Sequence, residues 1–289
     1  MPDSNTQINL PLICGSVVTS ESLGEFYILK DSLELFYRVT WYLAVDSFVF
    51  NKLSPLSNIN AYFVINHDIG SHGVNDSHKN DLHMALMIKK FYPCLRALLE
   101  HDYILLLDSD ILFVSQFSDK VYKHIVHSDV DAILSPHYSE DFKLESQVGR
   151  FNGGMICVKS LLFLNRWMQL SLNYKVNNWY YEQQPIEFAA REFLTSEFPI
   201  NCNIGWWRMN NQNTHSRFKS LILDGNYIRF MGMFAVCFHV HTIKSLEYTN
   251  YGAFLICHIV SMLKASSNPN HDILLNSIAS NMLQSWILE

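Results

Sequence analysis

The sequence predicts an α/β protein with a mostly parallel central sheet, flanked by helices on both faces and followed by a helical C-terminal extension. Short apolar runs alternate with segments of helical apolar spacing through the first half of the 289-residue chain. Such an alternation is typical of parallel strands joined by covering helices. Because 49% of the residues are hydrophobic, the chain can bury a large core.

The N-terminal half contains the more regular pattern. Apolar runs predict strands at residues 11–18, 38–45, 60–67 and 103–108. Helical spacing follows the first strand at residues 20–36 and precedes the fourth at residues 81–100. Pro93 is expected to break or kink the second of these helices, because proline lacks a backbone N–H.

The second half is less regular, although each predicted element still has its own signal. Short strands are predicted at residues 131–136 and 153–159, and Ser160 is a suitable N-cap for a helix to about Leu172. We expect one side of that helix to be apolar, with Leu161, Leu164, Trp167, Met168 and Leu172. Further segments are a helix at 181–194, two strands within 226–241 separated by Gly232, and an amphipathic helix from Asp272 that carries Ile273, Leu274, Ile278, Met282 and Trp286.

Charge and cysteine content exclude several classes of protein. The net charge of −6 carries no basic block, so we expect no nucleic-acid partner. The six cysteines form no CxxC pair, which indicates buried thiols in a reducing compartment. The N-terminus lacks signal-peptide features, and the apolar run 251–263 is too short to span a bilayer. We therefore predict a soluble, cytoplasmic protein without a transmembrane segment.

A D-x-D triplet, Asp108 and Asp110, ends the strand predicted at residues 103–108. Ligands of open α/β sheets bind beyond the carboxyl ends of the strands. Residues i and i+2 of an extended chain point the same way, so the two carboxylates would repel each other unless a cation lay between them. Carboxylate oxygens favour Mg²⁺ or Mn²⁺. The alternative is a structural turn, in which aspartates are also common.

Two later segments supply further candidate site residues. Asn152 precedes Gly153 and a glycine-rich strand, where the backbone can approach a ligand closely. Glu182 and Gln183 stand at the start of a predicted helix.

A strand end near the C-terminal extension supplies the last group, His239, His241 and Lys244. The two histidines share a face if the chain is extended, so either is a candidate third metal ligand. Burial in the core is the other interpretation of a histidine in an apolar strand.

The order of these motifs resembles the GT-A-fold glycosyltransferases. The apolar strand into D-x-D, the FN-x-G segment, the acid–Gln pair and the late His followed by Lys are most similar to glycosyltransferase family 8, the glycogenin-like retaining enzymes, and to related nucleotide-diphospho-sugar transferases. The resemblance covers roughly Ile13 to Lys244. It implies a Rossmann-like GT-A sheet, Mn²⁺ (or Mg²⁺) as cofactor, and a nucleotide-diphosphate sugar as donor substrate.

The resemblance also implies a role for each candidate residue. Asp108 and Asp110 would bind the metal together with His239 or His241, Lys244 would contact the diphosphate, and Gln183 would lie near the anomeric carbon. The residues that would contact the base, the donor or its sugar are Val18, Thr19, Lys90, Asn152, Gly153 and Glu182.

Three departures separate this chain from the family pattern. Gly153 stands where Ala or Ser is usual, Glu182 stands where Asp is usual, and HVHTIKS replaces an ending with Gly, Pro and Trp. The choice between His239 and His241 therefore stays open.

We predict a transferase domain over residues 1–249 and a helical extension over 250–289 packed on it. The predicted reaction moves a hexose from a nucleotide sugar, for which the resemblance favours UDP, to an unidentified acceptor with retention of configuration. One alternative is a haloacid-dehalogenase-type phosphatase with Asp108 as nucleophile and Asp110 as general acid; another is a non-catalytic nucleotide-sugar-binding protein. Trp206 and Trp207 are either an acceptor platform or a corner of the core.

Overall fold

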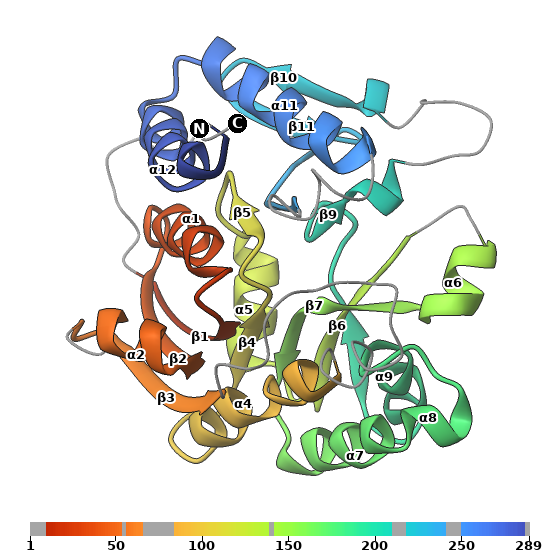
Figure 1. Cartoon of the computed structure of the whole chain (residues 1–289). Coiled ribbons are helices and arrows are strands. Elements are labelled where there is room, and N and C mark those ends of the chain that lie inside the picture. Colours follow the sequence, from red (N-terminus) through yellow and green to blue (C-terminus); the bar gives the residue numbers. More distant parts are fainter. Residues whose placement is uncertain are drawn as a thin grey trace.

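A seven-stranded sheet forms the centre of the protein in the computed structural model, which describes residues 10–53, 56–65, 84–138, 142–209, 218–240 and 250–286 (Figure 1). The strand order is β3-β2-β1-β4-β7-β6-β8. These strands are β1 (Pro11–Val18), β2 (Arg38–Asp46), β3 (Ile59–Ile65), β4 (Ile104–Leu107), β6 (Ala132–Pro136), β7 (Phe151–Val158) and β8 (Thr195–Glu197). Only β7 among them runs antiparallel to its neighbours β4 and β6. The sheet is therefore mostly parallel, as predicted.

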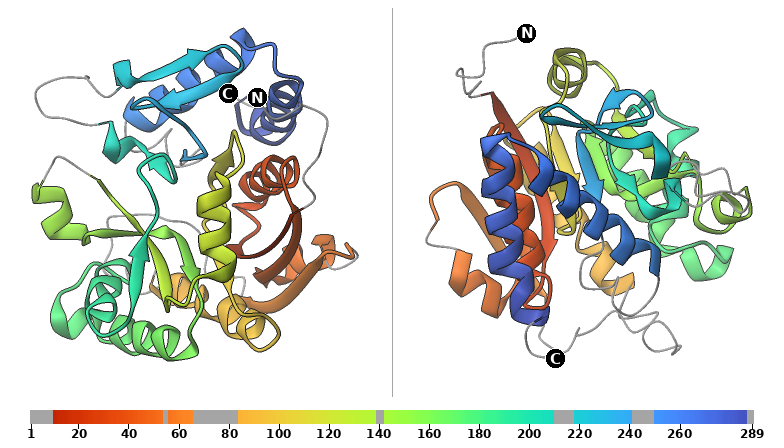
Figure 2. Two further views of the ribbon diagram at one scale, coloured as in Figure 1. Left: turned by 180° about the vertical axis from the view of Figure 1, so that it is seen from behind. Right: turned by 90° about the horizontal axis from the view of Figure 1, so that it is seen from above.

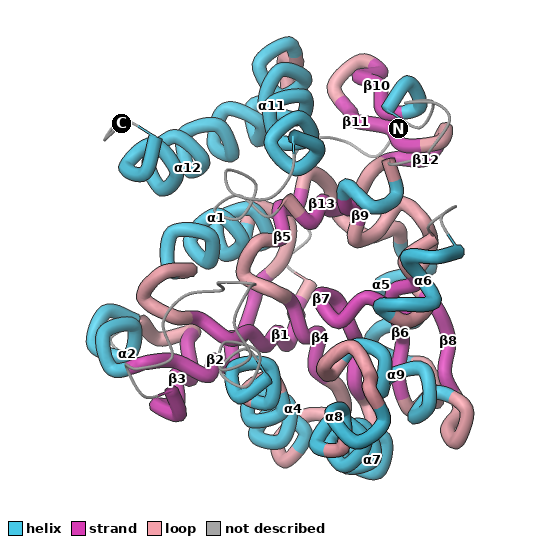
Figure 3. The backbone as a smooth tube through the Cα atoms, turned by 45° about the vertical axis from the view of Figure 1, so that its right-hand side comes forward, coloured by secondary structure: helices cyan, strands magenta, loops and turns pink. Residues whose placement is uncertain are grey.

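Helices cover both faces of this sheet (Figure 3). In β4, Leu105 and Leu107 pack into one core cluster while Ile104 and Leu106 pack into another on the opposite face. The first face is covered by α1 (Leu23–Glu34), α2 (Ser47–Leu53) and α5 (Asp119–His127), and the second by α4 (Phe91–Leu98), α7 (Leu161–Leu172) and α9 (Gln183–Ala190). Because successive side chains of a strand point to opposite faces, a strand buried on both faces is continuously apolar.

A second region lies beside the sheet and has its own core. It contains the three-stranded sheet β5 (Ile111–Phe113), β13 (Cys237–His239) and β9 (Ile204–Gly205), and a second one of β10 (Leu221–Asp224), β11 (Tyr227–Phe230) and β12 (Met233–Phe234). The remaining described elements are α6 (Phe142–Val148), α8 (Tyr174–Asn177), η1 (Trp206–Arg208), η2 (Phe218–Ser220), α11 (Asn250–Ala265) and α12 (Pro269–Trp286).

The prediction of two strands within residues 226–241 is wrong, because the structure has three. A turn with positive φ at Met231 and Gly232 separates β11 from β12. The chain then leaves that sheet, and β13 pairs instead with β5 and β9. The break between β12 and β13 comes from this change of partner sheet, which no local pattern encodes.

The predicted helix boundaries agree with the structure more closely than the predicted apolar faces do. Residues 84–88 are helical, and the run breaks before α4, where Pro93 lies in the first turn and its missing N–H costs nothing. Ser160 caps α7 as predicted, since its Oγ accepts a bond from the N–H of Phe163. The predicted apolar side of this helix is buried only in part, because Leu161 and Leu172 at its two ends are 37% and 59% exposed. The buried stripe of α7 runs through Phe163, Leu164, Trp167 and Ser171.

The C-terminal helix α12 packs on α1, the first helix of the chain, and α11 packs on α12 (Figure 2). In α12, Leu274 and Ile278 are buried whereas Ile273 is 48% exposed, and the Ser277 hydroxyl donates to Asp31 of α1. The division of the chain at residue 250 stays a prediction. None of the described helices combines the length and apolarity that a membrane crossing needs.

Candidate active site

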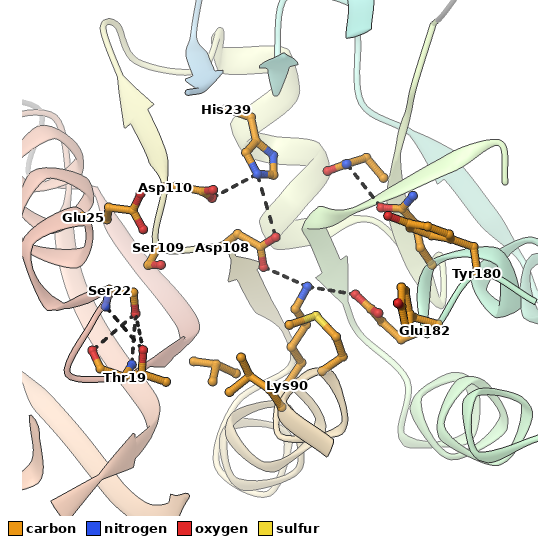
Figure 4. Close-up of a pocket in the computed structure, with 16 residues that line it drawn as sticks. Thr19, Ser22, Glu25, Lys90, Asp108, Ser109, Asp110, Tyr180, Glu182 and His239 are labelled. Atoms are coloured by element: carbon orange, nitrogen blue, oxygen red, sulfur yellow. Dashed lines mark hydrogen bonds and ion pairs between the residues drawn. The ribbon is translucent and has the colours of Figure 1, made fainter. Parts of the chain in front are cut away.

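A cleft lies at the carboxyl ends of the strands β1 and β4 (Figure 4). The carboxylate of Asp46, at the end of β2, accepts a bond from the N–H of Ser20 (2.6 Å) in the loop after β1 and one from the N–H of Val49 (2.9 Å) in α2. These bonds fix the loop at the edge of the cleft. The cleft brings together eight residues that the sequence marked: Thr19, Lys90, Asp108, Asp110, Asn152, Glu182, Gln183 and His239.

Three other residues that the sequence marked are not found in the cleft: one points into the core and two lie outside the residues that the structure describes. The side chain of Val18 is buried in the core, and its neighbour Val17 lines the cleft instead. His241 and Lys244 lie outside the described residues. Gly153 belongs to the site through its backbone, as its contacts with Lys90 and Gln183 show.

Asp108, Asp110 and His239 form a group that could hold a metal ion. One ligand atom from each lies within 4.8 Å of the others. The imidazole Nε2 of His239 is 3.0 Å from a carboxylate oxygen of Asp110 and 3.9 Å from one of Asp108. Two carboxylates and one imidazole are a donor set that Mn²⁺ accepts, and Mg²⁺ also binds such carboxylates. The residues present therefore fit the implied metal.

The two carboxylates converge through a turn, so the prediction that extended backbone brings them together is wrong. Ser109 and Asp110 are in a turn that separates β4 from β5. The carbonyl oxygen of Asp110 accepts a bond from the N–H of Val240 (2.9 Å), which ties the turn to the end of β13. Together with the pairing of His239 with Ile111 between β13 and β5, this bond places His239 beside the two aspartates.

Glycines at residues 153 and 154 let neighbouring side chains approach the strand β7. A β-carbon on Gly154 would collide with the ring of His239, and one on Gly153 would lie 2.9 Å from a carboxylate oxygen of Glu182. The Gly154 carbonyl also accepts a bond from the N–H of Asp108 (2.8 Å). The pair thus allows the candidate metal ligand His239 and the acid Glu182 to reach the cleft.

Lys90 is a buried cation that joins two of the acids. Its ammonium group lies 2.8 Å from Asp108 and 3.0 Å from Glu182, and it donates to the Gly153 carbonyl (3.3 Å). Burial lowers the pKa of Lys90, but the carboxylates of Asp108 and Glu182 outweigh it and hold the pKa above the usual value for lysine. Lys90 is therefore charged, and it neutralises part of the acidic cleft.

Gln183 has its amide group held on both sides. Its oxygen accepts bonds from the N–H of Gly153 (3.1 Å) and from Asn152 (3.4 Å), and its nitrogen donates to the Val148 carbonyl (3.2 Å). The same nitrogen lies 3.4 Å from Nε2 of His137.

His137 was not predicted as a site residue. Burial lowers its pKa to about 4, so the ring is neutral, and its Nδ1 donates to the Gly149 carbonyl (2.9 Å). Its Nε2 is then an acceptor, which fixes the orientation of the Gln183 amide. No sequence pattern marked this residue, since SPHY resembles an ordinary strand end.

The tryptophan pair belongs to the core and not to the cleft. Trp207 is 4% exposed and its ring packs edge-on against His239 at 5.1 Å and His137 at 5.8 Å. Trp206 packs against the core of the second region. Neither lines the cleft, so of the two interpretations the core corner agrees with the structure.

Comparisons with known proteins place the fold. No protein-family model matches the chain, and neither does any curated protein. Among solved structures, the galactosyltransferase LgtC, in complex with donor and acceptor sugar analogues, is 12% identical with a TM-score of 0.52, covering 89% of this chain and 97% of LgtC. The glycosyltransferase GlyE of Streptococcus pneumoniae TIGR4 is also 12% identical, with a TM-score of 0.54, covering 94% of this chain and 64% of GlyE.

These likenesses show that the chain has the GT-A-type fold of glycosyltransferases, as the sequence resemblance implied. Its structural neighbours are glycosyltransferases, and in this chain an Asp-Asp-His group at the end of β4 could bind a metal ion.

Proposed function

We propose that the protein is a metal-dependent glycosyltransferase, which moves a hexose from a UDP-linked sugar to an acceptor with retention of configuration. The observation that supports this most directly is the convergence of Asp108, Asp110 and His239 in one cleft with the buried Lys90 and the Glu182–Gln183 pair.

In this proposal Asp108, Asp110 and His239 hold a Mn²⁺ or Mg²⁺ ion, with Mn²⁺ favoured by the imidazole. When bound, the ion would act as a Lewis acid toward the diphosphate and stabilise its charge as the glycosidic bond breaks. Thr19 and Val17 lie where the loop after β1 meets the cleft, which fits contact with the nucleoside. The role of Lys244 at the diphosphate stays a prediction.

Lys90 would supply a second positive charge beside the departing diphosphate. Its ammonium group is already oriented by Asp108 and Glu182, so little reorganisation is required during the reaction. Because the group is buried, its charge is screened less than that of a surface lysine.

The contacts of Glu182 and Gln183 favour retention. An inverting reaction would need Glu182 as a base, yet Glu182 is buried and its charge is neutralised by Lys90. An amide is a poor nucleophile, and both ends of the Gln183 amide are held by bonds within the protein. We therefore assign Gln183 a stabilising role near the anomeric carbon. In this assignment the acceptor attacks that carbon from the side on which the diphosphate leaves.

Calorimetry with UDP and GDP, each titrated in Mn²⁺ and in EDTA, tests the metal and donor claims. We expect tight binding of UDP only with Mn²⁺, because without the ion the aspartates repel the phosphates. Equal affinity in both buffers would contradict the metal site. Equal affinity for UDP and GDP in Mn²⁺ would contradict the choice of base.

Release of UDP from a panel of UDP-hexoses separates the alternatives. The GT-A-type fold favours a transferase over a haloacid-dehalogenase-type phosphatase, for which inorganic phosphate would be the product instead. Tight UDP-sugar binding without any release of UDP would identify a non-catalytic binding protein. A cytoplasmic location is also proposed; the free thiols of all six cysteines agree with it.

A further inference from the structure

Asn203 lies behind the candidate metal ligand His239 and is fully buried. Its side chain bridges two residues of the cleft: the amide nitrogen lies 2.9 Å from Oδ1 of Asn152, and the oxygen lies 3.2 Å from Nδ1 of His239. We propose that Asn203 is a positioning residue that holds His239 in the Nδ1–H tautomer. The effect of Asn203 on metal affinity rests on the metal site proposed above.

The orientation of this chain of amides follows from one backbone group. The N–H of Gly154 lies 2.8 Å from the side chain of Asn152. A backbone N–H only donates, so the Asn152 atom facing it is the carbonyl oxygen and not the NH₂ group.

The same oxygen of Asn152 faces Asn203, so the Asn203 atom there must be its NH₂ group. The other end of the Asn203 amide, which faces His239, is then an oxygen that can only accept. Nδ1 of His239 must therefore carry a proton. This proton is assigned from a backbone donor, independently of any assumption about the metal.

The tautomer matters because the other ring nitrogen faces the two aspartates. A ring with its proton on Nδ1 can offer the lone pair of Nε2 to a metal ion held by Asp108 and Asp110, whose carboxylate oxygens lie 3.9 and 3.0 Å from that nitrogen. A histidine ligand commonly donates its second N–H to an oxygen, which fixes the tautomer and the angle of the ring. Edge-on contact with Trp207 restrains the same ring from another side.

Asparagine also suits the backbone at this position. Asn203 has a φ of 54°, in the left-handed region that asparagine, aspartate and glycine tolerate best. Its N–H donates to the Cys237 sulfur (3.2 Å), which ties it to β13. Asn203→Gly should therefore remove the two side-chain bonds with little backbone strain. Asn203→Asp should keep an oxygen toward His239, although its second oxygen would face Oδ1 of Asn152 without a proton to donate.

Nitrogen-15 NMR of the histidine rings tests the proton placement directly. In the metal-free protein we expect Nδ1 of His239 to carry a proton, and Asn203→Gly to lower the fraction of molecules in which it does. The His239 signal is assigned from its loss in His239→Gln. An Nδ1 without a proton in the parent would overturn the proposal.

Titration with Mn²⁺ alone, followed by the electron paramagnetic resonance signal of the free ion, tests the consequence. We expect Asn203→Gly to weaken binding about 10- to 100-fold and Asn203→Asp to recover part of that loss. Asn201→Ala is the matched control, because that partly exposed side chain contacts the Phe234 carbonyl and the Cys202 thiol, and it should leave affinity unchanged. Unchanged affinity in Asn203→Gly would overturn the role of Asn203. A parent that binds no Mn²⁺ would instead overturn the metal site, while the NMR result would still decide the tautomer.

Discussion

Two groups of polar residues at the cleft are held together by different interactions. One is a charged cluster of Lys90, Asp108 and Glu182, joined by ion pairs. The other is a hydrogen-bonded chain of amides and imidazoles, formed by His137, Gln183, Asn152, Asn203 and His239. The two groups share the β7 backbone, since Gly153 accepts from Lys90 and donates to Gln183.

The members of the first group compensate one another's charge, whereas the members of the second group orient one another. In the charged cluster each member compensates the charge of another, so the loss of one leaves a buried charge without compensation. In the chain of amides and imidazoles each member determines which way its neighbour points, so the loss of one changes orientation more than electrostatic energy. Substitutions in the first should act mainly on stability, and those in the second on site geometry.

The largest effect is expected from Lys90→Met, measured by urea unfolding in EDTA. The change leaves two carboxylates facing the position of one lost cation, and breaking such a buried pair costs about 3–5 kcal/mol. Lys89→Met is the matched control on the adjacent, partly exposed lysine, and it should change stability by less than about 0.5 kcal/mol. Equal effects of the two substitutions would show that the charged cluster contributes nothing specific.

A somewhat smaller effect is expected from Asp110→Asn, which removes a charge from the metal group without touching the contacts of Lys90. Loss of one such electrostatic contact costs about 10²- to 10³-fold in rate, or about 3–4 kcal/mol. The nearly isosteric change relieves repulsion with Asp108, so the melting temperature in EDTA should not fall. Full activity, or an unfolded metal-free protein, would show that the carboxylate pair is structural.

The smallest effect is the contribution of His137 to the pH dependence of stability. Its pKa is lowered to about 4 in the folded state by burial, so the unfolded chain takes up its proton first as the pH falls. Its contribution is complete above the unfolded value of about 6.5 and is lost as the pH falls toward 4, by at most about 3 kcal/mol.

Urea unfolding from pH 7.5 to pH 4 measures this slope. His137→Gln should flatten it, since glutamine does not titrate, whereas His127→Gln on the surface helix α5 should leave it unchanged. A slope that persists in His137→Gln would mean that other groups cause the acid sensitivity.

Much of the fold could be read from residues close together in the chain. The strands β1, β2 and β4 and the helices α1, α7 and α9 all lie where apolar spacing and the Ser160 cap predicted them. The second region escaped prediction in detail, because β5, β9 and β13 are short strands whose partners are remote: Phe238 of β13 pairs with Leu112 of β5 and with Ile204 of β9. Such strands have no periodicity of their own, and their partners define them.

By itself, the sequence determined the mostly parallel sheet and where the carboxylates, the Gly-Gly pair and the Glu-Gln pair stand along the chain. These features are local: strand alternation, helix caps and a D-x-D triplet each involve only a few neighbouring residues. Tertiary structure alone decided that a turn brings Asp108 and Asp110 together, that His239 joins them, and that Asn203 fixes its ring. Those contacts depend on hydrogen-bond partners far apart in sequence, and a buried amide or imidazole acquires its role only from the groups that face it.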